Sequence, residues 1–541
     1  MSVDYQRDRD NFEWNIPEGY NIPSVVESHA KEFGQRVAVR FLSESGSHET
    51  RTYNEIRDQM NRFANGLEEF GIGEGDRVMH LFPRHPDAFA VQLGILATGS
   101  LVVPCSSMLR ANDIEFRAND CEATAIVVHE SLTEMVEPVV DDTPLETVIV
   151  LDGGDDSLTF QDVTDDQSAD YDGPELRASM PVSINYTSGT TGKPKPVLHK
   201  HRWLHCFSRI NAPYWWGVDE ETDLEDELLW ATTGTGWAKW FWSPVGVGIT
   251  MGATQLIYDG EFDPETFLEI MEEEGVTKLC AVPTQYRMFA NEADLSEYDL
   301  AVNDLLSAGE PLNVEPIEQM REHVGVAPRD GYGQTETVAL VTNYPGIETK
   351  PGSMGKPTPG VGATLLDLDD EEEIEEAGEI GEIAVPIDSP AIFDGYFEKP
   401  HLDERKLSGE YYRTGDLARV DEDGFFFFEG RADDVIISSG YRIGPFEVED
   451  ALVSHEAVAE AAVVESPHDE RGAVVKAYIV LSTEFEGSEA LTETLQEHAK
   501  NETAPYKYPR RIEYVEELPK TSSGKIQRVK LREREQQQFG E

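Results

Sequence analysis

The chain has 541 residues, and its 105 Asp and Glu against 44 Lys and Arg give a formal net charge of −61. This length exceeds what one ordinary hydrophobic core organises, so it predicts two to four domains. Such an acidic surface repels nucleic acid and anionic membranes, which argues against both as binding partners.

The acidic excess is spread over the whole chain and is not confined to one tail, although residues 367–376 are especially dense in carboxylates. We therefore interpret it as a response to the solvent and predict a halophilic protein adapted to molar salt. At 1 M salt the Debye length is about 3 Å, which removes most of the self-repulsion that such a charge creates.

No targeting or membrane segment is evident. The N-terminus lacks the pattern of a signal peptide, the C-terminus carries no retention or peroxisomal tripeptide, and no apolar run reaches the roughly 20 residues of a membrane helix. We expect a cytoplasmic protein without stable membrane insertion. Since none of the cysteines forms a CxxC pair, we expect buried thiols at Cys105, Cys121, Cys206 and Cys280.

The first predicted elements are a strand and a long helix. Residues 36–42 alternate between apolar and polar positions, as in a half-buried strand. Residues 52–71 predict a helix, because Thr52 and Glu55 have the spacing of a capping box and Gly71 ends the pattern. One face of this helix carries an apolar stripe of Ile56, Met60, Phe63, Leu67 and Phe70.

Strand and helix patterns then alternate through the first half of the chain. Apolar strands are predicted at residues 76–82, 124–130, 146–152 and 252–259, and a buried helix within residues 87–104 leads into a further strand. Repeated strand–helix units with apolar strands predict mostly parallel sheets covered by helices, which is an α/β arrangement.

The pattern changes after Gly352. Residues 362–386 predict β-hairpin structure, and a second hairpin is predicted about Asp423 and Gly424. A compact α+β unit follows, with helices at 444–455 and 492–502 and strands at 458–465, 473–481 and 509–518.

The boundary between these parts is predicted within the GRADD segment. Residues 1–430 would then form an N-terminal domain, residues 431–434 a hinge, and residues 435–541 a C-terminal domain.

The most polar and flexible segment is TSGTTGKPK, residues 187–195. Its glycines permit positive φ and let backbone N–H groups point into one concavity, while hydroxyl and ammonium groups add donors and charge. It is not a Walker A loop, because two residues separate its glycines and a proline follows its first lysine. The segment predicts a pyrophosphate or triphosphate site formed by Thr187, Ser188, Gly189, Thr190, Thr191, Gly192, Lys193 and Lys195.

This loop resembles the phosphate-binding signature of the acyl-adenylate-forming superfamily, which includes acyl-CoA synthetases, luciferases and peptide-synthetase adenylation domains. Five further segments resemble that family in the expected order, namely SAGEPL, GYGQTET, YRTGDLARVDEDGFFFFEGRADD, SSGYRIGPFEVE and PKTSSGKIQR. The resemblance implies a large N-terminal domain of two mostly parallel sheets covered by helices plus a distorted β-barrel. It also implies a smaller, mobile α+β C-terminal domain.

The resemblance implies a reaction in two halves. A carboxylate attacks the α-phosphate of ATP to give acyl-AMP and pyrophosphate, and the CoA thiol then gives the thioester and AMP. ATP, Mg²⁺ and coenzyme A are the implied cofactors and co-substrates. Because both steps bring anions together, positioning and charge neutralisation should dominate catalysis.

Within the superfamily, the segments TGTGWAKW and TAPYKYPRRIEYVEELPKTSSGKIQR look closest to medium-chain acyl-CoA synthetases. An aryl- or short- or branched-chain acid CoA ligase is the first alternative, and a non-catalytic adenylate-binding sensor is the second. A P-loop kinase is disfavoured by the failed Walker spacing. A module serving a carrier protein is disfavoured because no carrier segment follows. A homodimer is left open.

The resemblance also implies roles for single residues. Lys525 matches the lysine that bridges the substrate carboxylate and the α-phosphate, and loss of one such preorganised contact typically costs about 10²–10³ in rate. Glu336 matches the carboxylate that holds Mg²⁺, and Thr335 lies where the family contacts the α-phosphate or the acyl carboxylate. Asp416 matches the residue that binds the ribose diol, and Arg431 the position beside ribose and phosphate.

Further residues are implied as contacts to each substrate. The other ATP and AMP contacts would be Gly309, Glu310, Pro311, Asp330, Gly331, Tyr332, Gly333 and Gln334. The CoA contacts would be Ser439, Gly440, Tyr441, Arg442, Arg471, Lys500, Tyr508, Pro509 and Arg510.

Three further positions complete the implied site. Asp433 matches the hinge, and Trp237 resembles the aromatic residue of the acyl pocket, whereas Trp240 and Trp242 are expected in the core. Met108 stands where related enzymes often carry a polar residue, and no CoA contact is assigned to its loop.

Overall fold

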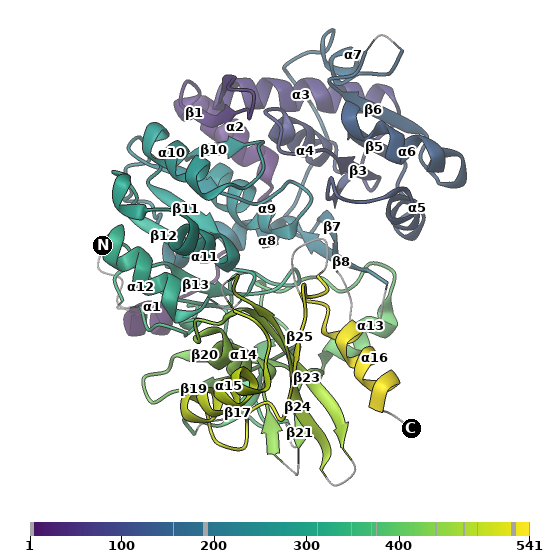
Figure 1. The fold of residues 1–541 in the computed structure, drawn as a ribbon. Helices are drawn as coiled ribbons and strands as arrows, with labels where there is room; N and C mark the ends of the chain where they lie inside the picture. Colours follow the sequence, from purple (N-terminus) through teal and green to yellow (C-terminus); the bar gives the residue numbers. More distant parts are fainter. Residues whose placement is uncertain are drawn as a thin grey trace.

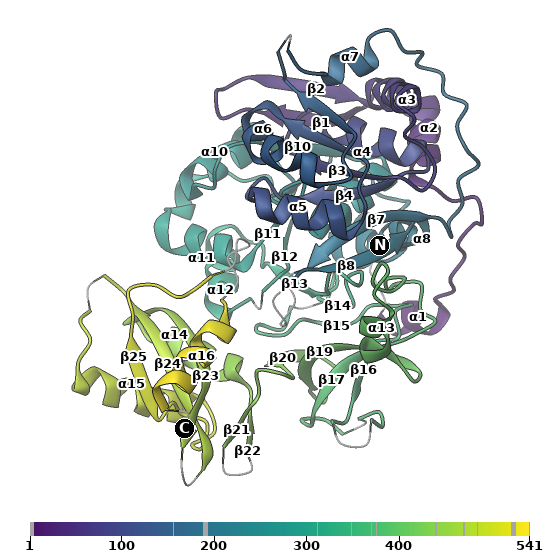
Figure 2. The same cartoon turned by 90° about the vertical axis from the view of Figure 1, so that its right-hand side faces the viewer.

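The computed structural model describes residues 5–154, 156–187, 193–310, 312–347, 349–368, 371–374, 376–438, 441–468, 471–483, 485–520 and 526–539, without the side chains of residues 405, 408, 441, 442 and 472. These residues form four sheets. Two large sheets make the upper part of the molecule, and an antiparallel sheet and the C-terminal sheet lie next to each other below them (Figures 1 and 2).

The first large sheet has six strands in the order β6-β5-β3-β4-β7-β8 and is parallel except for the β7–β8 hairpin. The predicted strands at 76–82, 124–130 and 146–152 are present as β3, β5 and β6. The bounds are β3 Arg77–Leu81, β4 Leu101–Cys105, β5 Ala125–His129, β6 Thr147–Leu151, β7 Pro181–Thr187 and β8 Lys195–Lys200.

The second large sheet has nine strands in the order β15-β14-β13-β12-β11-β9-β10-β1-β2. Its strands from β13 to β1 pair in parallel, and both ends are antiparallel. The strands are β1 Val37–Leu42, β2 His48–Thr52, β9 Leu228–Ala231, β10 Thr254–Tyr258, β11 Lys278–Ala281, β12 Asp304–Ser307, β13 Arg329–Tyr332, β14 Val341–Thr342 and β15 Lys356–Pro357. The mostly parallel arrangement predicted from the alternating pattern is confirmed.

A continuous apolar core lies between the two large sheets. It takes in α2 Ile22–Phe33, α3 Tyr53–Glu69, α4 Ala88–Ala97, α8 His201–Cys206, α9 Ala238–Trp240 and the π-helical segments Phe207–Trp216 and Phe241–Ile249. Every residue of α4 is buried, as its pattern, apolar except for Gln92, predicts. The outer faces are covered by α5 Ala111–Asp120 and α6 Thr133–Val136 on one side and by α10 Pro264–Glu274, α11 Pro283–Glu292 and α12 Val314–His323 on the other.

The helix α3 shows how the sequence defines local structure. The Thr52 backbone donates to Glu55 Oε2 at 2.7 Å, and the Glu55 backbone donates to Thr52 Oγ1 at 3.3 Å, which confirms the capping box. The stripe from Ile56 to Leu67 is buried. The prediction that Phe70 is its fifth member is wrong, since Phe70 is 45% exposed. The helix ends at Glu69, and the chain turns away at Gly71, where φ is +77°.

The expected distorted barrel corresponds to a five-stranded antiparallel sheet. Its strands are β16 Thr364–Leu366, β17 Ile380–Pro386, β18 Leu407–Ser408, β19 Tyr411–Val420 and β20 Phe426–Arg431, with α13 Pro400–Lys406 before β18. The β19–β20 hairpin turns at Gly424, where φ is +82°, as predicted for the Asp-Gly pair.

The C-terminal sheet runs β22-β21-β24-β23, with β25 pairing in parallel with β24. Its elements are β21 Ile436–Ser438, β22 Tyr441–Ile443, α14 Pro445–Val453, β23 Val458–His468, β24 Gly472–Leu481, α15 Glu489–Glu502, β25 Arg511–Tyr514 and α16 Arg528–Phe539. One apolar cluster joins α14 and α15 to the sheet, and a second joins α16 to it. The predicted α+β pattern is confirmed, with β21, β22 and α16 in addition.

The remaining helices are short: α1 Tyr5–Asn11, α7 Phe160–Thr164, and three 3₁₀ turns at Glu130–Leu132, Glu137–Asp142 and Leu295–Glu297. All four cysteines are buried and unpaired by disulfides, as expected. Among the described residues, no helix combines the length and apolar character that crossing a membrane requires.

Candidate active site

Two hydrogen-bond donors converge on one carboxylate where β13 meets the antiparallel sheet. Tyr332 Oη and Gln334 Nε2 donate to Asp416 Oδ2, at 2.7 and 2.5 Å. Asp416 of β19 pairs in register with Arg431 of β20, whose Nη1 lies 3.5 Å from Asp416 Oδ1. The structure thus brings together four residues that the sequence assigned to nucleotide binding.

The surroundings hold this carboxylate in one orientation. Asp416 is only 6% exposed, and Gln334 is fixed from its other side because Tyr412 Oη donates to its Oε1 at 2.7 Å. Burial alone lowers the pKa of Arg431, but the carboxylates of Asp416 and Asp433 outweigh burial and raise that pKa. A carboxylate has about four acceptor sites, so Asp416 retains the capacity to accept hydroxyl groups.

A second carboxylate, Glu336, lies on the same segment. Tyr396 Oη donates to Glu336 Oε1 at 2.9 Å, and the Phe393 backbone N–H donates to the Glu336 carbonyl at 2.7 Å. Burial, followed by Glu336, raises the pKa of Tyr396, which therefore stays a donor. Lys195 Nζ lies 5.8 Å from the centre of the Tyr396 ring, so one tyrosine contacts both Glu336 and the end of the phosphate loop.

The backbone at Thr335, next to Glu336, is fixed by a buried histidine. His199 of β8 lies with Nε2 2.7 Å from the Thr335 carbonyl, and its ring stacks on Trp203 with centroids 3.6 Å apart. Burial lowers the pKa of His199 to about 3, so the ring is neutral and its Nε2–H donates to that carbonyl. This contact ties the Thr335 segment to the hairpin that carries the phosphate loop.

The ends of the phosphate loop are the ends of the β7–β8 hairpin. Thr187 and Lys195 are register partners across it. Lys193 Nζ lies 5.5 Å from the centre of the Phe116 ring on α5. The predicted contacts Ser188, Gly189, Thr190, Thr191 and Gly192 lie outside the described residues.

The expected adenine wall follows β12. Gly309 has φ +112°, a conformation that favours glycine, and Lys239 Nζ donates to the Ala308 carbonyl at 2.6 Å. Glu310 Oε2 lies 3.2 Å from Thr284 Oγ1 and 3.7 Å from Arg287 Nη2. Pro311 lies outside the described residues.

The buried carboxyl group of Asp330 lies beside this wall, since Asp330 is in register with Ser307 of β12. Burial raises the pKa of Asp330 to about 7, while the Gly331 amide, Lys239 and the Leu312 amide act in the opposite direction. The Gly331 amide donates to Asp330 Oδ1 at 3.0 Å.

The glycines of GYGQTET are required by packing. A Cβ on Gly331 would lie 2.7 Å from the Trp215 ring, and one on Gly333 would lie 2.3 Å from the Trp242 ring. The segment that carries Gln334 and Thr335 therefore lies directly on buried indoles, which hold it rigidly.

On the expected acyl side, Trp237 is half-buried in the loop after β9, whereas Trp240 and Trp242 lie in the core, as predicted. Trp240 Nε1 donates to Gln92 Oε1 at 2.8 Å. A Cβ on Gly236 would lie 2.3 Å from the Cys105–Ser106 backbone, so this loop packs tightly on the end of β4.

The expected CoA residues fall in two places in the C-terminal domain. Lys500 Nζ and Arg510 Cζ lie 4.6 and 4.8 Å from the Tyr508 ring centre, and Gln496 Nε2 donates to the Pro509 carbonyl at 3.0 Å. Arg471 instead lies in the turn before β24 and next to Gly472, the register partner of Ser438. Ser439 and Gly440 lie outside the described residues, and only the backbone of Tyr441 and Arg442 is described, within β22. Met108 is 48% exposed.

Lys525, the predicted catalytic lysine, lies outside the described residues, but the segments on either side are placed. Lys520 and Ile526 form an antiparallel bridge, and Arg528 Nη2 lies 2.6 Å from Glu449 Oε2, which anchors the start of α16. The described residues between β25 and α16 lie on the side of the C-terminal sheet that faces the N-terminal part, while β21 lies on the far side (Figures 1 and 2).

Sequence reasoning missed three side chains around this site: His199, Tyr396 and Lys406. Lys406 of α13 donates to the Arg413 carbonyl at 3.0 Å. No sequence signal pointed to Tyr396 or Lys406. The alternation of buried positions in β8 would have placed His199 on the inner face beside Val197.

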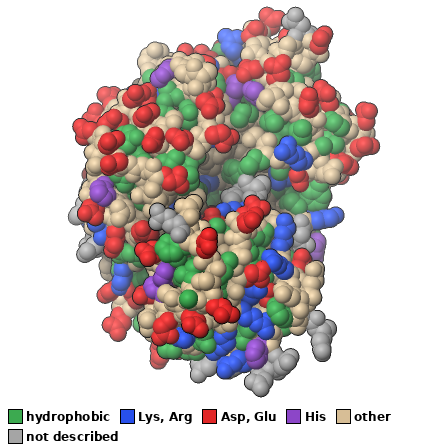
Figure 3. All heavy atoms as spheres, in the orientation of Figure 1, with side chains coloured by type: hydrophobic (Ala, Val, Ile, Leu, Met, Phe, Trp, Pro, Cys, Tyr) green, Lys and Arg blue, Asp and Glu red, His purple; other side chains and the backbone are tan. Residues whose placement is uncertain are grey.

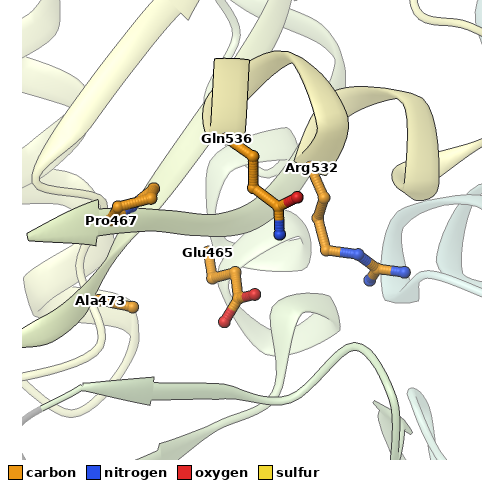
Figure 4. A pocket seen from close by; sticks show the side chains of 5 residues that line it. All are labelled: Glu465, Pro467, Ala473, Arg532 and Gln536. Atoms are coloured by element: carbon orange, nitrogen blue, oxygen red, sulfur yellow. The ribbon is translucent and has the colours of Figure 1, made fainter. Parts of the chain in front are cut away.

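The surface is hollowed between the N-terminal part and the C-terminal domain, with acidic side chains over much of the N-terminal part and both acidic and basic side chains below the hollow (Figure 3). The small pocket in Figure 4 is elsewhere: it holds about 110 Å³ between α16 and the β23–β24 strands. Glu465, Pro467, Ala473, Arg532 and Gln536 line it. A more open cavity of about 430 Å³ lies along α5 and includes Phe116, beneath Lys193.

The residues present fit a magnesium ion that is held largely by substrate. Among the described residues, no group of three or more His, Cys, Asp and Glu side chains could cage a metal. Mg²⁺ usually keeps several waters and binds through one or two carboxylates plus substrate phosphates, and Glu336, held by Tyr396, offers such a carboxylate.

Comparison with known proteins gives a consistent result over the whole chain. A model of the "AMP-binding enzyme" family matches residues 26–397, and one of the "AMP-binding enzyme C-terminal domain" matches residues 447–525. An uncharacterized acyl-CoA ligase, YtcI, of Bacillus subtilis (strain 168) is 42% identical over 527 residues, covering 96% of this chain and 97% of that protein.

Two more comparisons bear on the acid. The mitochondrial acyl-coenzyme A synthetase ACSM3 of Rattus norvegicus is 36% identical over 548 residues, covering 98% of this chain and 93% of that protein. Among solved structures, the anthranilate CoA ligase AuaEII in complex with anthranoyl-AMP superposes with a TM-score of 0.88 at 28% identity, covering 96% of this chain and 98% of that one.

Proposed function

From the premise that this chain belongs to the AMP-binding enzyme family and is an acyl-CoA ligase, we propose that it activates a medium-chain fatty acid. Acyl-CoA ligases of this family use ATP, Mg²⁺ and CoA and pass through an acyl-AMP intermediate. The convergence of Tyr332, Gln334 and Arg431 on Asp416 carries the proposal for the nucleotide. The similarity to ACSM3 and the half-buried Trp237 support the medium-chain acid.

Each residue then has a chemical task. The Asp416 carboxylate, oriented by Tyr332 and Gln334, accepts the ribose hydroxyls. Glu336 offers the oxygen ligand for Mg²⁺, which neutralises phosphate charge when bound. The Thr335 hydroxyl contacts the α-phosphate or the acid, and the Lys525 ammonium lies between these two anions as they approach.

The C-terminal domain serves both half-reactions in this proposal. Residues 1–430 form the N-terminal domain, residues 431–434 the hinge and residues 435–541 the mobile domain, with Asp433 at the pivot. The arrangement of Figures 1 and 2, with the described residues between β25 and α16 facing the N-terminal part, suits acyl-AMP formation. Rotation about the hinge would then bring the β21–β22 segment to the site, where the CoA thiol attacks acyl-AMP. The buried free thiols support a cytoplasmic location.

A substrate panel tests the acid. Acyl-CoA formation is measured with butanoate, octanoate and benzoate in high-potassium buffer with Mg²⁺, ATP and CoA, and octanoate should give the highest kcat/KM. Preference for benzoate would favour the alternative of an aryl-acid ligase, which the resemblance to the anthranilate CoA ligase supports. Absence of carboxylate-dependent pyrophosphate release with every acid would contradict the proposed function.

A further inference from the structure

Two cations meet beside a glycine of the TGDL segment. A Cβ on Gly415 would lie 2.9 Å from Lys406 Nζ and 3.3 Å from Arg431 Nη2, so both cationic groups reach the same small space next to β19. Gly415 has φ +79°, which other residues rarely adopt, and a side chain at this position would displace the two cationic groups. The space is next in sequence to Asp416.

The Lys406 ammonium contacts a neutral group at this point. Its Nζ donates to the Arg413 carbonyl at 3.0 Å. Arg431 Nη1 lies 3.5 Å from Asp416 Oδ1, and Arg431 Nε donates to Asp433 Oδ1 at 3.3 Å. Two like charges held this close repel each other, and partial burial strengthens the repulsion because water screens it less.

The electrostatics of Lys406 show the cost of this arrangement. Burial lowers the pKa of Lys406 and Arg431 lowers it further, while Glu336, Glu382 and Asp416 act in the opposite direction. Glu382 is already engaged, since its Oε1 accepts from the Gly415 backbone at 2.8 Å and its Oε2 from Arg413 Nε at 2.8 Å. An anion in the space beside Gly415 would relieve the repulsion between the two cations.

We propose that Lys406 and Arg431 form a two-cation subsite beside Gly415 that binds the phosphate chain of ATP and the pyrophosphate released from it. The inference rests on the proposed function and extends it by a residue that none of the motifs contains. Lys406 is a binding residue, and its ammonium complements the Mg²⁺ and the phosphate loop on the triphosphate. In this role it lowers the KM for ATP and leaves the KM for the acid unchanged.

The test removes the charge and keeps the local hydrogen bond. Lys406→Gln can still donate to the Arg413 carbonyl, and Lys406→Arg keeps the charge. Binding of inorganic pyrophosphate with Mg²⁺ is measured by calorimetry on the full chain, and the KM for ATP by carboxylate-dependent pyrophosphate exchange. Lys406→Gln should weaken pyrophosphate binding and raise the KM for ATP, each by about tenfold, which is the usual effect of one charge-assisted hydrogen bond. Lys406→Arg should restore most of the loss.

Lys399→Gln is the matched control, because Lys399 directly precedes the same helix while its Nζ lies 2.9 Å from Asp120 Oδ1 on α5. It should leave both measurements unchanged. Unchanged pyrophosphate binding in a folded Lys406→Gln variant would overturn the inference. Pyrophosphate binding requires no turnover, so this outcome is separate from failure of the wild-type protein to activate any acid, which would overturn the proposed function.

Discussion

Asn313 at the start of α12 donates through Nδ2 to the Asp450 carboxylate of α14 and thereby joins the N-terminal part to the C-terminal domain. Its amide forms no cap with its own helix and accepts instead from Arg287 Nη1 at 3.3 Å. Arg287 also lies 3.7 Å from Glu310 of the expected adenine wall. A short polar chain therefore links that wall to the position of the C-terminal domain.

Asn313→Ala should loosen the arrangement in which the segment before α16 faces the N-terminal part. One lost hydrogen bond is worth about 1 kcal/mol, so acyl-AMP formation should slow by about fivefold. Thioester formation from supplied acyl-AMP should not slow. Both half-reactions are measured separately, with Asn303→Ala as control, because the side chain of Asn303 forms hydrogen bonds with Lys278 and Glu227 at the other end of β12. An equal loss in both half-reactions would show that the contact does not favour one arrangement.

Tyr396→Phe should raise the Mg²⁺ concentration needed for half-maximal pyrophosphate exchange. The variant removes the hydroxyl that donates to Glu336 Oε1 at 2.9 Å, and loss of such an orienting partner typically costs 10- to 100-fold in metal affinity, about tenfold being expected here. The measurement is a Mg²⁺ titration at saturating ATP. Tyr411→Phe is the control, since its hydroxyl binds Glu373 at the surface. An unchanged Mg²⁺ requirement would show that Tyr396 has no role in metal binding.

Asp330 should lower the stability of the folded protein above neutral pH, relative to acidic pH. Burial raises the pKa of this carboxyl from an ordinary 3.8 to about 7, so the folded protein keeps a proton that the unfolded chain loses. This contribution to stability therefore falls as the pH rises from about 4 to about 7.

Asp330→Asn removes that dependence. Relative to the wild type, the variant should gain about 2 kcal/mol of stability on going from pH 5.5 to pH 8, measured by thermal melting at both values. Asp299→Asn, at an exposed position, is the control and should show no such difference. If the melting temperatures of the wild type and of Asp330→Asn changed equally between pH 5.5 and pH 8, Asp330 would ionise normally.

The parts of the fold that were predictable from sequence have long patterns or distinctive turns. The capping box and stripe of α3 extend over four turns, and the Asp-Gly turn of β19–β20 is a strong local signal. The strands β11 and β12 were missed, because four apolar or mixed residues do not distinguish a buried strand from a helix segment. Their place in the sheet comes from the tertiary core.

The same contrast holds for the site. Tyr332, Gln334, Asp416 and Arg431 lie within motifs, and the structure brings them together. His199, Tyr396 and Lys406 act on the site from separate elements, and only packing brings them there. Tyr396 and Lys406 leave no local pattern in the sequence, and for His199 only the alternation within β8 gives a signal.

Lys525→Ala should impair acyl-AMP formation by about 10²–10³, because no cation then lies between the approaching carboxylate and α-phosphate. Thioester formation from supplied acyl-AMP should be far less affected, since in that step no free carboxylate has to approach the α-phosphate. Lys520→Ala is the matched control, because Lys520 Nζ lies 2.7 Å from Glu460 Oε1 within the C-terminal domain. Equal loss in both half-reactions would refute the role assigned to Lys525.

The net charge of −61 predicts that stability rises with salt. At low salt the carboxylates repel one another over distances comparable to the protein radius, whereas at 1 M KCl the screening length falls to about 3 Å. The melting temperature should therefore climb between about 0.01 and about 1 M KCl, because the screening length falls from about 30 Å to about 3 Å over this range. Because salt also strengthens hydrophobic burial, a titration with sorbitol, which raises osmolality without screening charge, is the control. A melting temperature that is the same in dilute buffer and in molar KCl would mean that the acidic surface is not an adaptation to salt.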